Sequence, residues 1–436
     1  MNERNETHDI EARSFVESAN ADECDFPLQN LPYGAFSRGN DSDSSLCVAI
    51  GDQVFDLREA ACRKLLDIDE DISEACQDDC LNSLMGLGPE RWSRLRGELF
   101  HLLHTNSTRR QEAADCLHSQ SEVTLTMPVC IGDYTDFYTS VHHATNVGAL
   151  FRPENPLLPN YKWVPIAYNG RASSIVLSGA AIRRPNGQLK APDSAAPRLA
   201  PSQRLDYELE IGAFVGVGNE LGSAIPITEA GDHIFGLCLL NDWSARDVQV
   251  WEYQPLGPFL AKSFATTISP WIVTTEALVP FRCPAATRPD GDPHPLPYLD
   301  NPDDALRGGF GIHLEAYLCS AKMREAGCPP HCITRSNLRD MYWTFSQMLA
   351  HHSSNGCNLR PGDLLGSGTI SGPTAAARAC LLELTRGGAE PITLPDGSQR
   401  TFLQDGDEVT LRAYCRREGT VSIGLGSATG VILPAR

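Results

Sequence analysis

One segment of the sequence, residues 132–148 (GDYTDFYTSVHHATNVG), holds an acid, phenols and an imidazole between two glycines. Asp136 supplies a hard oxygen ligand for a metal ion, and the phenol of Tyr138 can form hydrogen bonds with a bound molecule. His143 supplies a base that titrates near neutral pH. The same residues also fit an ordinary half-buried strand, so the segment predicts an active-site loop only in combination with residues further along the chain.

Two further carboxylates stand two residues apart in the run YELEIGAFVGVG. In a strand this spacing places Glu208 and Glu210 on one face, with Cα atoms about 7 Å apart, so both can bind one cation. The apolar residues that follow predict a buried strand, in which paired carboxylates need a metal ion or a cationic side chain. A solvated strand face is the alternative interpretation.

Asp242, which follows the apolar run IFGLCLL, adds a fourth carboxylate to this group. Four carboxylates around one site would repel each other strongly in the absence of a divalent ion. Ligation by oxygen alone favours Mg²⁺, Ca²⁺ or Mn²⁺ over Zn²⁺. The sequence therefore predicts a metal site with oxygen ligands from Asp136, Glu208, Glu210 and Asp242.

Cationic and amide side chains follow Asp242 in the sequence. If the segment WSARDVQVWEY is helical, Asp242, Arg246 and Gln249 share one face, because they are four and three residues apart. An Asp–Arg pair within an exposed helix, which stabilises it by roughly a few tenths of a kcal/mol, is the simpler alternative. Lys262 lies in an apolar segment shaped by Gly and Pro, where its ammonium group requires a negative partner.

The elements that must position these residues are mostly strands. After residue 120, short β-type runs separated by Gly and Pro dominate, and the two predicted helices cover residues 231–253 and 336–353. We therefore expect a mainly β fold with flanking helices (α+β). The long Pro-rich connections 183–205 and 283–309 predict functional or mobile loops.

The chain before residue 120 has a different pattern. Residues 1–30 are polar without a hydrophobic period, and we expect a disordered tail. Residues 31–120 begin with strand, turn and strand and continue as helices with apolar residues three and four apart, which predicts a small β and helical domain. Residues 121–436 would then form a second, catalytic domain.

Composition excludes several classes of partner. Of the 436 residues, 36 are Lys or Arg and 55 are Asp or Glu, so the net charge of −19 argues against nucleic acid and anionic membranes. No apolar run approaches the roughly 18 residues of a membrane span, and the N-terminus does not resemble a secretion signal. The 15 cysteines are scattered singly, which indicates reduced thiols and a cytoplasmic protein.

Longer blocks of sequence resemble the fumarylacetoacetase family over nearly the whole chain after Leu31. They occur in the family's order, and their combined length makes chance similarity negligible. The blocks are DYTDFY, HATNVG, LLPNY, GRASS, ELE, NDWSARD, WEYQPLGPFLAKSF, HHSSNGCNLRPGDLLGSGTISGP and FLQDGDEV. The resemblance implies a small SH3-like β N-terminal domain, followed by a β-rich catalytic domain of the fumarylacetoacetase type that works as a homodimer.

The resemblance also implies a role for individual residues. His143 would be the general base oriented by Glu383, and the spacing to ATNVG favours His143 over its neighbour His142. Arg246, Gln249 and Lys262 would stabilise the developing oxyanion. The carboxylates Asp136, Glu208, Glu210 and Asp242 would hold Ca²⁺ or Mg²⁺, and Lys262 and Thr266 occupy positions associated with a second Mg²⁺. The implied substrate contacts are Tyr138, Arg152, Tyr168, Gln249, Tyr253 and Thr369.

The implied reaction is hydrolysis of the carbon–carbon bond of the diketo acid 4-fumarylacetoacetate to fumarate and acetoacetate, the last step of tyrosine and phenylalanine catabolism. A metal-stabilised enolate and a water activated by His143 would carry it. A related acylpyruvate hydrolase, 2-oxo acid decarboxylase or isomerase is the alternative enzyme class. A metal-binding homologue without catalysis is the third hypothesis, and it would be expected to lack His143, Glu383 or a carboxylate.

Overall fold

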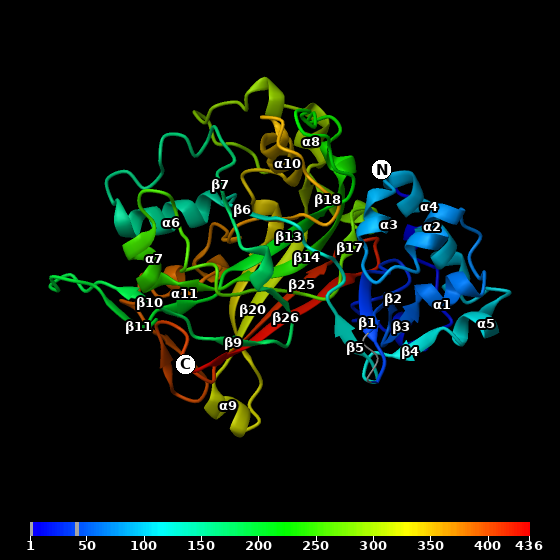
Figure 1. Cartoon of the computed structure of the whole chain (residues 1–436), viewed down its shortest axis with the longest axis horizontal. Coiled ribbons are helices and arrows are strands. Elements are labelled where there is room, and N and C mark those ends of the chain that lie inside the picture. The colour runs from blue at the N-terminus through cyan, green and yellow to red at the C-terminus, as the bar shows by residue number, and fades with distance from the viewer. Residues whose placement is uncertain (1–2, 40–42) are drawn as a thin grey trace.

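The structure, a computed structural model, describes residues 3–39 and 43–436. A smaller N-terminal part, blue to cyan in Figure 1, lies beside a larger part that contains the long strands β13, β14, β20, β25 and β26. Strands form the core of both parts and helices lie around them, so the predicted mainly β fold with flanking helices is confirmed.

The N-terminal part is built on one antiparallel sheet of five strands in the order β4-β3-β2-β1-β5. Asp56 ends β3 and caps the first helix, because its Oδ1 accepts a 3.0 Å hydrogen bond from Glu59 N. The strands are β1 (Tyr33–Ser37), β2 (Ser45–Ile50), β3 (Gln53–Asp56), β4 (Leu117–Ser119) and β5 (Thr124–Thr126). The helices are α1 (Leu57–Cys62), α2 (Glu70–Ala75), α3 (Asn82–Gly86), α4 (Pro89–Leu103) and α5 (Arg110–Ala114).

The expected disorder of the first 30 residues is wrong for residues 3–30. They form two turns of 3₁₀ helix, η1 (Glu6–His8) and η2 (Glu17–Asn20), and bury Phe15, Val16 and Leu28 in the core of the N-terminal part. Irregular backbone held by side-chain hydrogen bonds has no hydrophobic period, so the sequence pattern could not reveal it. Residues 1 and 2 lie outside the described residues.

The first sheet of the larger part carries most of the predicted acidic residues. Its strand order is β7-β6-β22-β13-β14-β16-β8, and β17 also pairs with β14. All residues of the central strands β13 and β14 are buried. The bounds are β6 (Tyr134–Phe137), β7 (Ala167–Asn169), β8 (Ile175–Leu177), β13 (Leu209–Val215), β14 (Ile234–Asp242), β16 (Thr266–Ile268), β17 (Val273–Thr274) and β22 (Leu364–Gly366).

A second sheet, of five strands in the order β21-β20-β25-β26-β9, packs on the first. Trp243 lies between them, fully buried, and its indole donates a 2.9 Å hydrogen bond to Thr267 Oγ1. A Cβ at Gly430 would come within 2.7 Å of the Trp243 ring, so β26 needs glycine there. The strands are β9 (Ala181–Arg183), β20 (Ile312–Cys319), β21 (His331–Asn337), β25 (Glu408–Cys415) and β26 (Ile423–Leu433).

Shorter elements surround the two sheets. The two-stranded pairs are β10 (Asn186–Leu189) with β11 (Arg198–Pro201), β12 (Leu205–Asp206) with β15 (Ser244–Ala245), β18 (Arg282–Cys283) with β19 (Gly309–Phe310), and β23 (Ile392–Thr393) with β24 (Gln399–Arg400). The helices are α6 (Val141–Phe151), α7 (Arg246–Glu252), α8 (Pro302–Arg307), α9 (Ala321–Glu325), α10 (Phe345–Ser353) and α11 (Leu381–Leu384). Turns of 3₁₀ helix are η3 (Ala172–Ser174), η4 (Ala230–His233), η5 (Val279–Phe281), η6 (Pro297–Leu299), η7 (Leu338–Asp340) and η8 (Ala375–Ala377).

Three local predictions are wrong. The predicted helix 231–253 is strand β14 followed by the short helix α7, because a strand buried on both faces has no alternation that distinguishes it from a helix. The predicted helix 336–353 becomes α-helical only from Phe345, where Thr344 and Gln347 form a capping box. The predicted loop 183–205 contains the β10–β11 hairpin, which projects from the molecule at the left of Figure 1.

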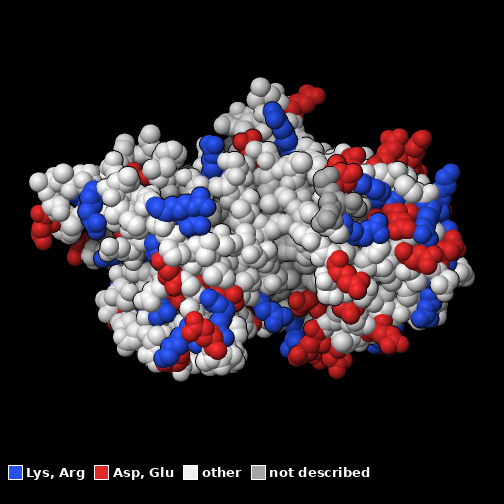
Figure 2. All heavy atoms as spheres, turned by 60° about the horizontal axis from the view of Figure 1, so that its bottom comes forward, with Lys and Arg blue, Asp and Glu red and all other residues white. Residues whose placement is uncertain are grey.

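Charge is distributed unevenly over the surface. Figure 2 shows acidic and basic side chains crowded over the N-terminal part at the right, and a broad uncharged area across the middle of that face. Pairs such as Arg58–Asp79 and Arg63–Glu59 are partly exposed and stabilise the fold only slightly. None of the helices in residues 3–39 and 43–436 is long and apolar enough to cross a membrane.

Candidate active site

The four predicted carboxylates meet at one end of the first sheet. Asp136 lies in β6, Glu208 directly before β13, Glu210 in β13, and Asp242 at the end of β14. All four are buried, and each offers an oxygen within 4.8 Å of the others. They converge because β14 is the direct neighbour of β13 and only β22 separates β13 from β6.

These carboxylates are suited to a hard divalent cation. Asp136 Oδ1 and Glu210 Oε1 are buried and have no hydrogen-bond partner among the described residues. Burial raises the pKa of Asp136, and the negative charge of Asp242 raises it further. The pKa of Glu210 is likewise raised by burial and then by Asp136. Without a metal ion, neither carboxyl group ionises readily. A Cβ at Gly366 would lie 2.6 Å from Asp136 Oδ1, so glycine leaves that oxygen room. The donor set therefore fits a metal ion.

Lys262 lies against the same cluster and forms ion pairs with Glu208 and Asp242. Burial alone would lower the pKa of Lys262, but the two carboxylates outweigh it and raise this pKa. Burial also opposes ionisation of Glu208, yet Lys262 and Arg246 hold its pKa below the ordinary value. A protonated ammonium donates and cannot bind a cation, so a second ion would need the main-chain oxygen of Lys262 instead. Thr266 Oγ1 lies 3.4 Å from Asp242 Oδ1.

His143 stands on the first turn of α6. Ser140 caps this helix, because its Oγ accepts a hydrogen bond from His143 N. His143 Nδ1 lies 2.6 Å from Glu383 Oε2, which leaves Nε2 as the nitrogen able to take a proton from a bound molecule. Burial would raise the pKa of Glu383, but the charge and hydrogen bond of His143 lower it to about 2. His142 does not line the cavity and lies near Asp340.

Three residues that the sequence analysis missed hold Glu383 in place. Asn146 Nδ2 donates to Oε1 at 2.8 Å, while Ser371 Oγ donates to Oε2 at 2.7 Å and Cys380 Sγ lies 3.2 Å from Oε2. Asn146 stands one helical turn after His143, a spacing that could have identified it. Ser371 and Cys380 carry no comparable signal in the sequence.

Arg246 does not pair with Asp242, the partner that the sequence alone suggests, but has other partners. Its Nε donates to Asp206 Oδ2 at 2.9 Å, and its NH2 lies 2.8 Å from Glu208 Oε1. Asp242 pairs instead with Lys262 and accepts a 2.8 Å hydrogen bond from the hydroxyl of Tyr168. Gln249, one turn after Arg246, accepts a 3.2 Å hydrogen bond from it, which leaves the Gln249 amide N–H groups free to donate.

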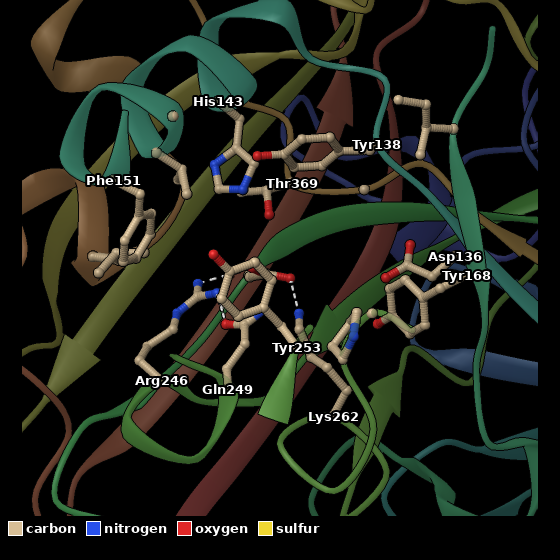
Figure 3. A pocket seen from close by; sticks show the side chains of 18 of the residues that line it. Asp136, Tyr138, His143, Phe151, Tyr168, Arg246, Gln249, Tyr253, Lys262 and Thr369 are labelled. Atoms are coloured by element: carbon tan, nitrogen blue, oxygen red, sulfur yellow. Dashed lines mark hydrogen bonds and ion pairs between the residues drawn. The ribbon is translucent and has the colours of Figure 1, made fainter. Parts of the chain in front are cut away.

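A cavity of about 410 Å³ joins these groups. Figure 3 shows His143, Tyr138 and Thr369 on one side of it and Arg246, Gln249 and Lys262 on the other. Of the predicted site residues, Glu383, Asp242 and Thr266 lie behind the lining. The others line it directly: Asp136, Tyr138, His143, Arg152, Tyr168, Glu208, Glu210, Arg246, Gln249, Tyr253, Lys262 and Thr369. The sequence analysis did not identify the apolar wall of Val147, Phe151, Leu158, Val250, Leu256 and Leu382, nor Arg204.

Two family models match the chain. The model described as fumarylacetoacetate (FAA) hydrolase C-terminal covers residues 133–432, and the model described as fumarylacetoacetase N-terminal covers residues 29–128. The chain belongs to the fumarylacetoacetase family. Its cluster of four carboxylates, the His143–Glu383 pair and the cavity between them all lie within the C-terminal match.

Curated members of the fumarylacetoacetase family match nearly the full chain. The Arabidopsis thaliana fumarylacetoacetase is 48% identical over 97% of this chain and 99% of its own length. The Bos taurus and Homo sapiens enzymes are also 48% identical, over 95% of this chain and 98% of theirs. Among solved structures, a fumarylacetoacetate hydrolase from Exiguobacterium antarcticum shares the fold, with a TM-score of 0.50 and 16% identity over 93% of this chain and all of that one.

Proposed function

We propose that this chain hydrolyses the carbon–carbon bond of 4-fumarylacetoacetate to fumarate and acetoacetate, the last step of tyrosine and phenylalanine catabolism. The observation that carries the proposal is one cavity with the buried His143–Glu383 pair on one side and four converging carboxylates on the other. Relatives called fumarylacetoacetase match over nearly the whole chain, which supports the substrate.

Asp136, Glu208, Glu210 and Asp242 would hold the metal, Ca²⁺ or Mg²⁺. Carboxylate oxygens alone form this group, as these hard cations prefer. When bound, the ion supplies a Lewis acid for the oxygens of the diketone. The ion would share Glu208 and Asp242 with Lys262, whose side chain lines the cavity.

His143 acts as the base on water. Glu383 fixes the tautomer with the proton on Nδ1, so Nε2 takes the proton of a water molecule and the resulting hydroxide attacks the ketone carbon. The ionised Glu383 stabilises the imidazolium that forms. As the carbon–carbon bond breaks, its electron pair passes to the acetoacetate fragment as an enolate. The proton that His143 took from water then passes to the enolate carbon, which forms acetoacetate and restores the neutral imidazole.

Arg246, Gln249 and Lys262 stabilise negative charge on the attacked oxygen. They lie opposite His143 across the cavity, so the substrate carbonyl would sit between the base and these donors (Figure 3). Fixed donors in a dry site need no reorganisation as charge develops. Tyr138, Arg152, Tyr168, Tyr253 and Thr369 would bind the rest of the substrate.

We infer that the protein works as a cytoplasmic homodimer. Exposed apolar side chains stand at the mouth of the cavity, which favours a surface covered by a second copy: Phe151, Leu158, Val250 and Leu256. The fifteen cysteines are free thiols, which supports a reducing compartment. Sedimentation analysis of the purified protein at several concentrations tests the dimer, and a monomer throughout would contradict it.

The experiment that tests the function follows the diketone absorbance of fumarylacetoacetate in the presence of Ca²⁺ or Mg²⁺. We expect the absorbance to fall, with fumarate and acetoacetate formed in equal amounts. The Bos taurus fumarylacetoacetase serves as the positive control, and acetylpyruvate as a competing substrate tests the acylpyruvate alternative. No turnover of fumarylacetoacetate under conditions where the control is active would overturn the proposal.

A further inference from the structure

Asp206 is a fully buried carboxylate that lies outside the cavity lining. It ends strand β12, which pairs with β15 directly before helix α7. Its Oδ1 accepts hydrogen bonds from Leu381 N at 2.7 Å and from its own neighbour Tyr207 N at 2.9 Å. Its Oδ2 accepts from Leu382 N and from Arg246 Nε, both at 2.9 Å.

Two of these donors belong to the helix that carries Glu383. The residue before α11, Cys380, makes no side-chain capping bond, so the first N–H groups of the helix lack a local acceptor. Asp206 provides that acceptor from a distant strand, through the N–H groups of Leu381 and Leu382. Glu383 is the next residue, and it holds His143.

A third donor belongs to the opposite side of the cavity. The guanidinium of Arg246 donates through Nε to Asp206, and this bond fixes the direction in which its other nitrogens point. We propose that Asp206 is a positioning residue. It joins the two arms of the site, namely helix α11 with Glu383 and the side chain of Arg246, and so sets the separation between the base His143 and the oxyanion donor Arg246. The inference rests on the proposed function.

Only a carboxylate satisfies this arrangement. Its two oxygens accept all four bonds, whereas an asparagine offers one oxygen and an NH₂ group that would face two donors. The substitution Asp206→Asn therefore keeps the volume but leaves one pair of donors unpartnered, either the N–H groups of Leu381 and Tyr207 or the N–H of Leu382 with Arg246 Nε. Either outcome loosens one arm relative to the other, and small displacements of reacting groups reduce turnover strongly.

The test compares Asp206→Asn with a matched control, Asp407→Asn. Asp407 is a buried carboxylate that likewise binds an arginine, Arg400, at 2.8 Å and a main-chain N–H, that of Gln404, but it lies away from the cavity. We expect both variants to lose similar thermal stability. Asp206→Asn should lose about 10²-fold in kcat, with KM and bound Ca²⁺ nearly unchanged, and Asp407→Asn should keep the wild-type kcat.

Combination with Glu383→Gln separates positioning from general destabilisation. If Asp206 acts through α11 and Arg246, its substitution should cost less in the Glu383→Gln background than in the wild type, because one of the two arms is already impaired. Full multiplication of the two losses would overturn the inference. So would wild-type kcat in Asp206→Asn, or an equal loss of kcat in Asp407→Asn.

A second variant and a spectroscopic measurement keep the proposal testable if Asp206→Asn fails to fold. Asp206→Glu keeps the charge and both acceptor oxygens, and it should fold while still lowering kcat. The downfield proton resonance of the His143–Glu383 hydrogen bond should shift in the Asp206 variants and stay in place in Asp407→Asn; an unchanged resonance would contradict the inference without any assay of turnover. If the wild type itself fails to hydrolyse fumarylacetoacetate, the proposed function fails, whereas the resonance still tests Asp206.

Discussion

The two ends of the cavity satisfy their buried carboxylates in different ways. At the His143–Glu383 end, each oxygen of Glu383 accepts at least one hydrogen bond from the protein. At the other end, Asp136 Oδ1 and Glu210 Oε1 find no donor among the described residues. The protein therefore satisfies the carboxylate of Glu383 with its own donors, whereas two oxygens at the other end remain available to a cation.

Removal of divalent ions should have the largest effect. Activity should be abolished, because four carboxylates without a cation cannot all stay ionised in a buried site. The folded state should lose about 2.7 kcal/mol of stability relative to protein at 100 times the metal's Kd. Turnover and thermal melting measured after chelation, and again after addition of Ca²⁺ or Mg²⁺, check this. Full activity of a verified metal-free sample would contradict the assignment.

Replacement of the base should have the next largest effect. His143→Ala should lose about 10² to 10⁴ in kcat, since general base catalysis contributes in that range. His142→Ala is the matched control and should stay within a few fold, because His142 does not line the cavity. Steady-state kinetics of both variants check this. A larger loss in His142→Ala would identify the other imidazole as the base.

Replacement of an oxyanion donor should have the third largest effect on kcat. Gln249→Ala should cost about 10² to 10³ in kcat, as the loss of one fixed donor does, with little change in KM or in bound metal. Lys262→Met should cost more, because it removes a charge from a dry site where two carboxylates face it. Kinetics with metal analysis check both. A raised KM with unchanged kcat would mean that these side chains only bind the substrate.

The support of Glu383 should give the smallest effect. Asn146→Ala removes the 2.8 Å donor to Glu383 Oε1. We expect a loss of about tenfold in kcat, which corresponds to the lower limit of the about 1.5 to 3 kcal/mol that a hydrogen bond to a charged group contributes. Thr145→Ala on the same helix is the control, because its hydroxyl bonds only the carbonyl of Val141. Equal kcat in the two variants would show that the pair is held without Asn146.

The sequence predicts which residues come together at the cavity better than it predicts the elements that carry them. The spacing of Glu208 and Glu210 was sufficient to predict two carboxylates on one strand face, because a strand repeats every two residues. The distinction between helix and strand failed at residues 234–242, where burial on both faces removes the period. Glu383 and Thr369 came only from the family resemblance, since neither stands in a pattern of its own.

Hydrogen bonds between residues far apart in the sequence cannot be predicted from local patterns, for a physical reason. Asp206 accepts from residues 175 and 176 positions away, and Ser371 reaches Glu383 through the turn before α11. Such contacts depend on how β12 and α11 pack against each other, and no local periodicity encodes that packing. The sequence therefore assigns no role to Asp206, although its carboxylate accepts from four donors.

The contacts of Asn5 and His8 with Glu276 determine when the N-terminal segment can complete its folding during synthesis. Asn5 donates a 2.6 Å hydrogen bond to Glu276 Oε1, a partner 271 residues later, and the ring of His8 lies 2.8 Å from the carbonyl of Glu276. At a synthesis rate of about 5 to 20 residues per second, the ribosome reaches Glu276 roughly 14 to 54 s after Asn5. Asn5 and His8 thus wait this long for their partner, and a nascent chain stalled before residue 276 should leave this segment open to proteases.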